Sequence, residues 1–238
     1  MTVLPFKALI DIFRHNRCAI VGSAPSGLLN EPGLIDSYDI VIRINNYKTK
    51  GIDLKGVPYD YSLNLGLRCD YHYSFYGGSI RKTADELKAD GVKGHLCKCP
   101  NDECHVTKWH IANNQRQGGD FKPIYRRRND FWFAPVYIPK TGHYMELFNA
   151  LGKHVPTTGF ACIWELSQCY ADELYITGFD FFRSIQHNVD EMWNPGRQDD
   201  PIKHMPDAEL DMFTKIYQKN GNINPDATIR KLLCRRTR

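Results

Sequence analysis

The sequence of 238 residues has no apolar run that approaches the roughly 20 residues needed to cross a bilayer. The N-terminal stretch MTVLPFKALIDIFRHNR also lacks the long apolar core and the small-residue cleavage site of a signal peptide. Both absences predict a cytoplasmic protein, or a chain from which a membrane anchor has been removed. The apolar, charged and aromatic fractions are ordinary, so composition excludes a disordered chain, a collagen and a coiled coil.

Regular cysteine spacing and a strong net charge are missing as well. In a chain far larger than a disulfide-stapled mini-domain, the eight irregularly spaced cysteines indicate mostly reduced thiols.

The net charge is only +4, but the positive charge is concentrated in RRR at 126–128 and RKLLCRRTR at 230–238. These clusters suit an anionic partner, such as a membrane surface, a sugar phosphate or a nucleic acid, and they equally fit a solvated face and a frayed tail.

Apolar stretches alternate with helical patterns, and this order predicts one α/β domain over residues 1–238, with a mostly parallel sheet flanked by helices. RCAIVGSA at 17–24 and YDIVIRIN at 38–45 have the composition of buried strands. Two later strands are expected in FWFAPVYIP at 131–139 and in LYITGFD at 174–180.

Helices are expected between these strands. SIRKTADELKAD at 79–90 has a helical composition with Ser79 as a candidate N-cap, and TGHYMELFNALGKH at 141–154 follows the same pattern. A further helix is expected from Pro206 onward, because proline suits the first helical turn. The polar stretch at about 92–130 has no periodicity, and we expect a long irregular loop or insertion there.

Three stretches have the composition of ligand-binding loops at strand or helix ends. GSAPSG at 22–27 follows the first strand, and its small residues would let backbone N–H groups approach a phosphate or a ribose. Asn45 ends the second strand, where open α/β sheets bind ligands, and offers both a donor and an acceptor. PTTG at 156–159 would supply an anion site or an ordinary helix cap. Plain turns and caps remain the alternative for all three.

A cysteine-rich stretch, CKCPNDECH, raises a zinc hypothesis. Its candidate ligands are Cys97, Cys99, Cys104 and His105. Because two well-separated CxxC pairs are missing, reduced loop thiols are the alternative interpretation.

His204 lies just before the helix that Pro206 is expected to begin. The positive end of that helix disfavours an imidazolium, so a neutral His204 could accept a proton near pH 7. Glu209, in the first helical turn, is favourably placed against the same dipole. These features fit an ordinary capped helix as well as a catalytic base.

The order of these pieces carries more information than any one of them. CAIVGSAPSG, with IDSYDIVIRIN shortly after it, resembles the large sialylmotif of the family 29 sialyltransferases, and VPTTGFACIWELSQCYADELYITGFDF resembles the small sialylmotif. His187 falls where the third motif has its His, and His204 with Glu209 reproduces the HxxxxE pattern of the very small sialylmotif. GSAPS is also similar to the GNGPS loop of bacterial family 42 sialyltransferases. Residues 66–150 match none of these motifs.

The resemblance implies a single Rossmann-like domain with a GT-A variant sialyltransferase fold, and an inverting transferase that uses a CMP-activated sugar and no metal or other cofactor. By motif position, the donor-binding residues would be Gly22, Ser23, Asn45, Thr157, Thr158, Gly159 and Gly178. His204 would be the general base that takes the proton of the acceptor hydroxyl, and His187 would stabilise the departing CMP phosphate. Glu209 would support this geometry.

The chain also departs from the family pattern. Ser23 stands where the family usually has Asn, and Asn188 replaces the usual aromatic residue after His187. The family typically bridges a Cys of the large motif to one of the small motif, and the matching pair here is Cys18 and Cys169. In a cytosol these two thiols should be free, so either they pack as small apolar groups or the protein is not cytosolic.

The resemblance also sets the expected partners. The donor would be CMP-sialic acid or, as an alternative, CMP-Kdo, and the acceptor a glycan such as a lipid-linked lipooligosaccharide. No nucleic acid is expected, and the basic tail with LPFKALIDIF would hold the protein peripherally at the inner face of an anionic membrane. A truncated Golgi-type protein is the alternative location.

Two other functions compete with a transferase. A nucleic-acid-binding module would use RRR, the basic tail and a zinc loop, and it predicts strongly salt-dependent affinity but leaves the two histidines unexplained. A nucleotide-binding protein that lost catalysis would keep the fold, but the presence of His187 and His204 counts against it.

Overall fold

The computed structural model describes residues 2–45, 47–52, 58–75, 82–100, 108, 133–183 and 204–236. Eight strands form one sheet in the order β1-β8-β7-β6-β3-β2-β9-β10, and every pair of neighbours runs parallel. They are β1 (Val3–Leu4), β2 (Arg17–Val21), β3 (Ile40–Ile44), β6 (Tyr71–Ser74), β7 (Gly94–Cys97), β8 (Val136–Tyr137), β9 (Glu173–Thr177) and β10 (Ile223–Pro225). A separate antiparallel pair joins β4 (Lys50–Ile52) to β5 (Pro58–Asp60).

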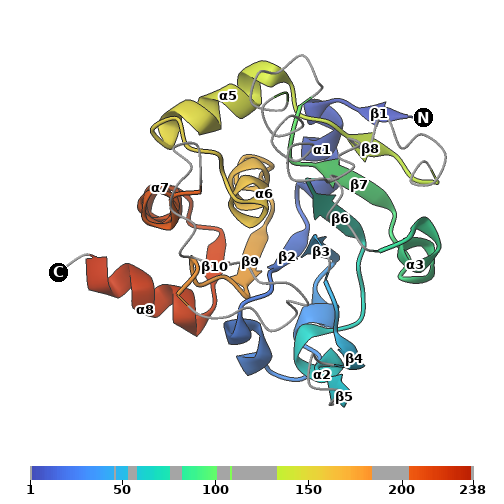
Figure 1. Ribbon diagram of the computed structural model, residues 1–238. Helices are drawn as coiled ribbons and strands as arrows, with labels where there is room; N and C mark the ends of the chain where they lie inside the picture. The colour runs from blue at the N-terminus through green and yellow to red at the C-terminus, as the bar shows by residue number, and fades with distance from the viewer. Residues whose placement is uncertain are drawn as a thin grey trace.

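Helices cover both faces of the large sheet (Figure 1). The face that carries Cys18 and Ile20 packs against five helices: α1 (Phe6–Phe13), α5 (Thr141–Ala150), α6 (Thr158–Leu166), α7 (Pro206–Lys219) and α8 (Ala227–Arg236). The opposite face carries Ala19 and Val21, because successive side chains of a strand alternate between the two faces. Four shorter helices cover it: η1 (Pro25–Leu29), η2 (Ile35–Ser37), α2 (Ser62–Leu65) and α3 (Ala84–Ala89).

The structure confirms the predicted fold class, a mostly parallel α/β sheet flanked by helices. The strands predicted at 17–24, 38–45 and 174–180 correspond to β2, β3 and β9, and α7 begins at Pro206 as expected. Among the described helices, none combines the length and the apolar character that a membrane span requires.

Some predicted boundaries are wrong. β7 lies inside the range 92–130 that was expected to be irregular, because its sequence GHLC is buried on both faces yet contains a polar His95 that hides the pattern. The helix expected over 79–90 begins only at Ala84, where Thr83 and Glu86 form a reciprocal capping box. Ser79 lies outside the described residues, as do residues 101–132 apart from Lys108.

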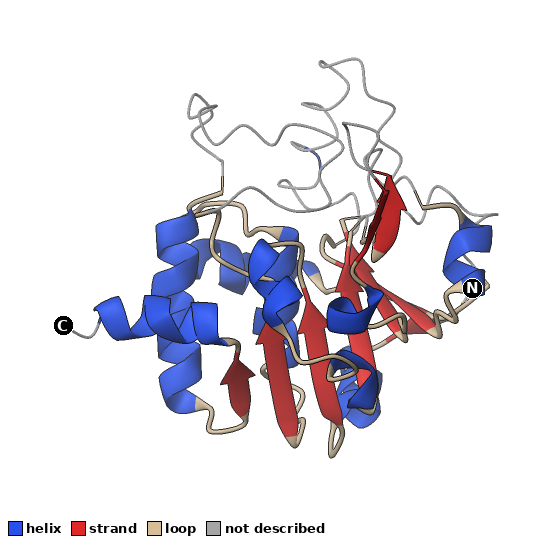
Figure 2. Ribbon diagram, turned by 90° about the horizontal axis from the view of Figure 1, so that it is seen from below, coloured by secondary structure: helices blue, strands red, loops and turns tan. Residues whose placement is uncertain are grey.

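The strand order identifies where a ligand would bind. From β2 the chain builds the sheet in one direction through β3, β6, β7 and β8, and β9 then adds to the other side of β2. The connections that follow β2 and β9 therefore diverge at this point, which is the usual ligand site of open α/β sheets. Figure 2 shows the strands pointing toward one common edge.

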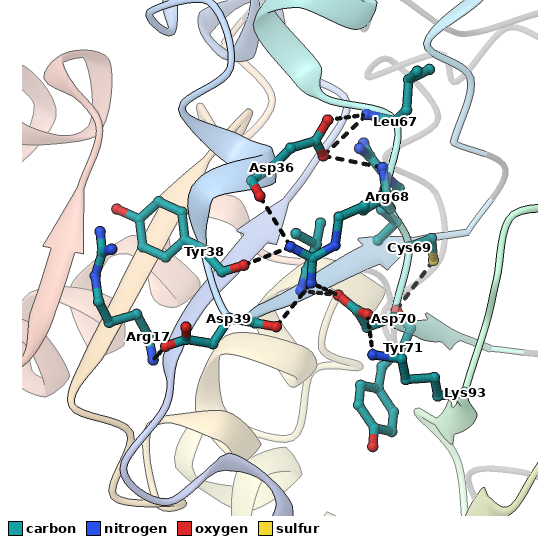
Figure 3. A network of polar contacts seen from close by, with 12 residues as sticks. Arg17, Asp36, Tyr38, Asp39, Leu67, Arg68, Cys69, Asp70, Tyr71 and Lys93 are labelled. Carbon is teal, nitrogen blue, oxygen red and sulfur yellow. Dashed lines mark hydrogen bonds and ion pairs between the residues drawn. The ribbon is translucent and has the colours of Figure 1, made fainter.

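The opposite, amino-terminal edge is held by a polar network around Arg68 (Figure 3). Its guanidinium donates to the carbonyl oxygens of Asp36, Tyr38 and Asp39 and to the Asp70 carboxylate, at 2.7 to 3.0 Å. Asp70 also accepts from the Val41 N–H at 2.9 Å. Since these groups are engaged with the backbone that leads into β3 and β6, we assign this network a structural role.

A buried carboxyl lies within the core next to α6. Glu165 accepts hydrogen bonds from Tyr73 at 3.0 Å and from Tyr137 at 3.3 Å. Burial raises the pKa of Glu165 to about 8, although the two tyrosine bonds oppose the shift. The folded protein therefore holds a proton that the unfolded chain, with a pKa near 4.5, releases.

Replacement of Glu165 by glutamine is expected to make stability less dependent on pH. Between pH 4.5 and 8 the folded state of the native protein binds one more proton, so its free energy of unfolding falls by about 1.4 kcal/mol per pH unit as pH rises. Glu165→Gln should lose this slope and gain relative stability toward pH 8. Urea denaturation at pH 5.5, 6.5 and 7.5 measures it, with the exposed Glu31→Gln as control. Equal slopes in Glu165→Gln and the native protein would contradict the prediction.

Candidate active site

The three predicted donor-binding glycines lie close together at the point where the β2 and β9 connections diverge, with Gly22 and Gly159 against the Phe179 ring and Gly178 against Gly22. A Cβ on Gly22 would lie 2.3 Å from the Gly178 carbonyl oxygen, and a Cβ on Gly159 would lie 2.3 Å from the Phe179 ring. Gly178 has φ 75°, and a Cβ there would lie 2.6 Å from the Gly22 carbonyl oxygen. Only glycine, which has no Cβ, fits these contacts. The glycines therefore allow the segments that follow β2, begin α6 and follow β9 to approach one another closely.

Ser23 and Asn45 also lie at the carboxyl edge of the sheet. Ser23 is half-buried directly after Gly22, and within the described parts of the chain its hydroxyl has no hydrogen-bond partner. Asn45 follows β3 with φ 52°, a left-handed conformation that asparagine tolerates, and its side chain is exposed. Its Oδ1 accepts from Ser74 at the end of β6, at 3.2 Å. Both residues can therefore offer polar groups to a ligand.

Thr157 begins α6 as its N-cap, and its Oγ1 accepts from the Phe160 N–H at 3.1 Å. Glu209, buried in the first turn of α7, accepts from the Thr157 N–H at 2.5 Å and from its hydroxyl at 2.9 Å. His204 Nδ1 lies 2.7 Å from the carbonyl oxygen of Val155. The HxxxxE segment is thus joined to PTTG by two hydrogen bonds and to the preceding Val155 by a third, although 52 residues separate Thr157 from Glu209.

These contacts fix the protonation state of His204. Because a carbonyl oxygen only accepts, Nδ1 carries the proton and Nε2 keeps a free lone pair. Burial, together with the positive charge of Lys98, lowers the pKa of His204 to about 4, although the bond to Val155 opposes this shift. The imidazole is therefore neutral at pH 7, as the sequence predicted, but burial rather than the helix dipole is the main cause.

Glu209 holds the start of α6 and has no hydrogen bond or ion pair to His204 among the described contacts. Burial raises the pKa of Glu209 to about 7, and the two bonds from Thr157 partly offset this shift. Glu209 therefore bonds to the segment that carries Val155 and not to His204 itself, and its supporting role stays a prediction.

Lys98 was missed in the sequence and lies at the same edge. It follows β7 directly, its N–H donates to the Ser74 carbonyl oxygen at 2.9 Å, and its side chain is only 3% exposed. The ammonium lies 5.2 Å from the centre of the Phe75 ring. Its position at the end of a strand could have identified Lys98 as a candidate site residue. This position was not recognised, because β7 itself was not predicted.

The two described zinc candidates do not share a site. Cys97 packs with Tyr47, Cys69 and Val136, whereas Cys99 packs in a different cluster with Tyr144. Cys104 and His105 lie outside the described residues, and among the described residues no group of three or more His, Cys, Asp or Glu side chains could hold a metal ion.

The cysteine pair implied by the family resemblance is not bridged. Cys18 and Cys169 are free thiols, buried in the main core with apolar neighbours. Burial raises the pKa of Cys18 to about 12, so this thiol is unreactive near neutral pH.

His187, the other predicted catalytic residue, lies outside the described residues. The chain that leads toward it contains two phenylalanines with left-handed backbones, Phe181 (φ 52°) and Phe182 (φ 59°). Such conformations cost roughly 1–2 kcal/mol each for a residue with a Cβ, and they cluster at functional sites.

No protein-family model matches the chain, and no curated protein matches it. Among solved structures, a mammalian sialyltransferase in complex with Gal-beta-1-3GalNAc-ortho-nitrophenol is similar over 94% of this chain and 73% of its own, with 20% identity and a TM-score of 0.50. The sialyltransferase CstII from Campylobacter jejuni, in complex with cytidine-5'-monophosphate, is similar over 91% of this chain and 87% of its own, with 12% identity and a TM-score of 0.53. Cst-I, a monofunctional alpha-2,3-sialyltransferase from the same organism, is similar over 89% of this chain and 75% of its own, with 11% identity and a TM-score of 0.51. At these identities the likeness shows the fold, and the chain therefore has the fold of these sialyltransferases.

Proposed function

We propose that the protein is a CMP-sugar-dependent glycosyltransferase. It would transfer sialic acid, or the related sugar acid Kdo, from CMP to a hydroxyl group of a glycan acceptor, with inversion and without a metal. The observation that carries the proposal is the junction of the PTTG and HxxxxE segments, in which Glu209 holds Thr157 and His204 bonds to Val155. Two motifs that resemble parts of one active site in sequence thus meet in space.

The donor site of this proposal lies at the carboxyl edge of the sheet. The N-terminus of α6, which begins at Thr158, provides the backbone N–H groups of Thr158 and Gly159 and a positive dipole end that suit a phosphate, while the Thr157 N–H is already donated to Glu209. Ser23 and Asn45 provide polar side chains for the nucleoside. The similar CstII structures with CMP, one of which also holds a trisaccharide acceptor, support this choice of ligand.

The proposed chemistry needs a base, an oriented acceptor and charge stabilisation. His204 Nε2 takes the proton of the acceptor hydroxyl while that oxygen attacks the anomeric carbon. The bond between this carbon and the phosphate oxygen breaks, and CMP leaves with the electron pair. Because the phosphate is already a good leaving group, orientation and electrostatic stabilisation supply the remaining rate enhancement. His187 is proposed for the phosphate on the basis of its motif alone.

Calorimetry with CMP, UMP and AMP tests the donor site. We expect CMP to bind most tightly, and we expect Asn45→Gly to weaken CMP binding by roughly tenfold, the effect of one lost hydrogen bond. Glycine is the suitable replacement because the backbone at position 45 has φ 52°. Unchanged CMP affinity in Asn45→Gly would remove this residue from the site, and equal affinity for all three nucleotides would contradict the proposed donor class.

A further inference from the structure

The Lys98 side chain is buried, burial lowers its pKa, and the described residues place no counter-ion in contact with its ammonium group. Its side chain is 3% exposed, and neither a hydrogen bond nor an ion pair to its ammonium is found in the described chain, although it interacts with the Phe75 ring. The acidic groups that act on Lys98 are the Cys99 thiol and the more weakly acting Glu209, and both oxygens of Glu209 already accept from Thr157. Burial of an unpaired charge costs several kcal/mol, so such a group is retained mainly where it has a function.

The surroundings of Lys98 connect it to the candidate active site. Phe75, which lies under the ammonium, packs in one small cluster with Cys99 and Val155. The carbonyl oxygen of Val155 is the group that holds His204. On the other side, Ser74 accepts from the Lys98 backbone and donates to Asn45. Lys98 therefore lies between the proposed base and the proposed nucleoside contact.

We infer that Lys98 binds an anionic oxygen of the donor, and that this oxygen is the counter-ion that the described residues do not provide. This inference rests on the proposed function, since the donor of that reaction carries two anionic groups, the phosphate that joins the sugar to the nucleoside and the carboxylate of the sugar acid. Either group would neutralise the ammonium in a partly desolvated site, where a charge-assisted hydrogen bond is strong.

The test compares native protein with Lys98→Met, which keeps most of the side-chain volume and removes the charge. The calorimetric ligands are cytidine, CMP, a non-transferable analogue of CMP-sialic acid, and inorganic phosphate. We expect roughly a 10- to 100-fold loss of affinity for the analogue, the range for a hydrogen bond to a charged group, with cytidine unaffected. If CMP loses the same factor, Lys98 contacts the phosphate, whereas a loss confined to the analogue assigns the carboxylate.

A second measurement separates binding from folding. Because Lys98→Met removes an unpaired buried charge, the ligand-free variant should melt at the same temperature as the native protein or higher. The control is Lys88→Met, a lysine on α3 whose side chain is 50% exposed. It should leave every affinity unchanged.

Other outcomes decide between this inference and the proposed function. Native affinity for CMP and the analogue in Lys98→Met, or an equal loss for cytidine, would overturn the role of Lys98 while the proposed function stands. If the native protein binds phosphate through Lys98 but none of the cytidine ligands, the anion site stands and the proposed donor fails. If it binds none of these ligands, both proposals fail.

Discussion

Replacement of His204 by asparagine is expected to lower the rate of sugar transfer by a factor of about 10²–10⁴, the usual contribution of a general base. Asparagine places an amide N–H near the position of Nδ1, so it can keep the bond to the Val155 carbonyl oxygen that His204 makes at 2.7 Å. It removes Nε2, the atom proposed to take the proton. The loss should therefore appear in kcat, measured with saturating donor and acceptor, while CMP affinity stays within a factor of about two.

The matched control is His15→Asn, at the opposite edge of the sheet. His15 is exposed, contacts Asp172 and has φ 61°, a backbone that asparagine accepts, so this variant should keep full activity. The pH profile gives a second check. Because the pKa of His204 is about 4, the base stays unprotonated above about pH 5, and activity should fall only below that value. An acid limb near pH 6.5, or full activity in His204→Asn, would contradict this role.

Gly178→Ala is expected to lower the free energy of unfolding by about 2–5 kcal/mol, in two parts. The left-handed backbone, with φ 75°, costs an L-residue roughly 1–2 kcal/mol. In addition, the new Cβ would lie 2.6 Å from the Gly22 carbonyl oxygen. Because the Cβ is fixed by the backbone and the oxygen belongs to the backbone, no side-chain rotation can relieve this contact. Such overpacking adds typically 1–3 kcal/mol.

Gly33→Ala separates these two contributions. Gly33 has φ 78°, nearly the same as Gly178, but a Cβ there meets nothing within 4 Å. It should therefore cost only the backbone part, roughly 1–2 kcal/mol. Denaturant unfolding of both variants measures the difference. Equal losses of unfolding free energy in Gly178→Ala and Gly33→Ala would show that the close approach of the β2 and β9 connections adds nothing to the cost of Gly178→Ala.

The sequence predicted those elements whose signal is local. β2 and β9 are short apolar runs buried on both faces, and α7 begins at Pro206, so composition and a single proline were sufficient. β7 was missed because it has only four residues, one of which is the polar His95, and the polar Lys98 follows it directly. Both polar residues are buried, and they interrupt the apolar pattern that is typical of a buried strand. Local composition cannot show that a polar residue is buried.

The candidate site could be predicted only in part, for a related reason. The motifs named His204, Glu209 and Thr157, but the bonds between Glu209 and Thr157 depend on the packing of α7 against α6. The glycines were predicted as ligand contacts, and the structure adds a packing reason for each of them. Lys98 carries no motif, so only its burial beside Phe75 identifies it.

The central claim, transfer of a sugar acid from CMP, is tested most directly by the release of CMP from CMP-sialic acid and from CMP-Kdo in the presence of EDTA. A suitable acceptor is Gal-beta-1-3GalNAc, the disaccharide portion of the ligand bound by the similar mammalian enzyme, together with a panel of other glycans. We predict that the native protein releases CMP from at least one donor, that EDTA leaves the rate unchanged, and that His204→Asn releases it at least 100-fold more slowly. Absence of CMP release from both donors, or equal release by His204→Asn, would contradict the account.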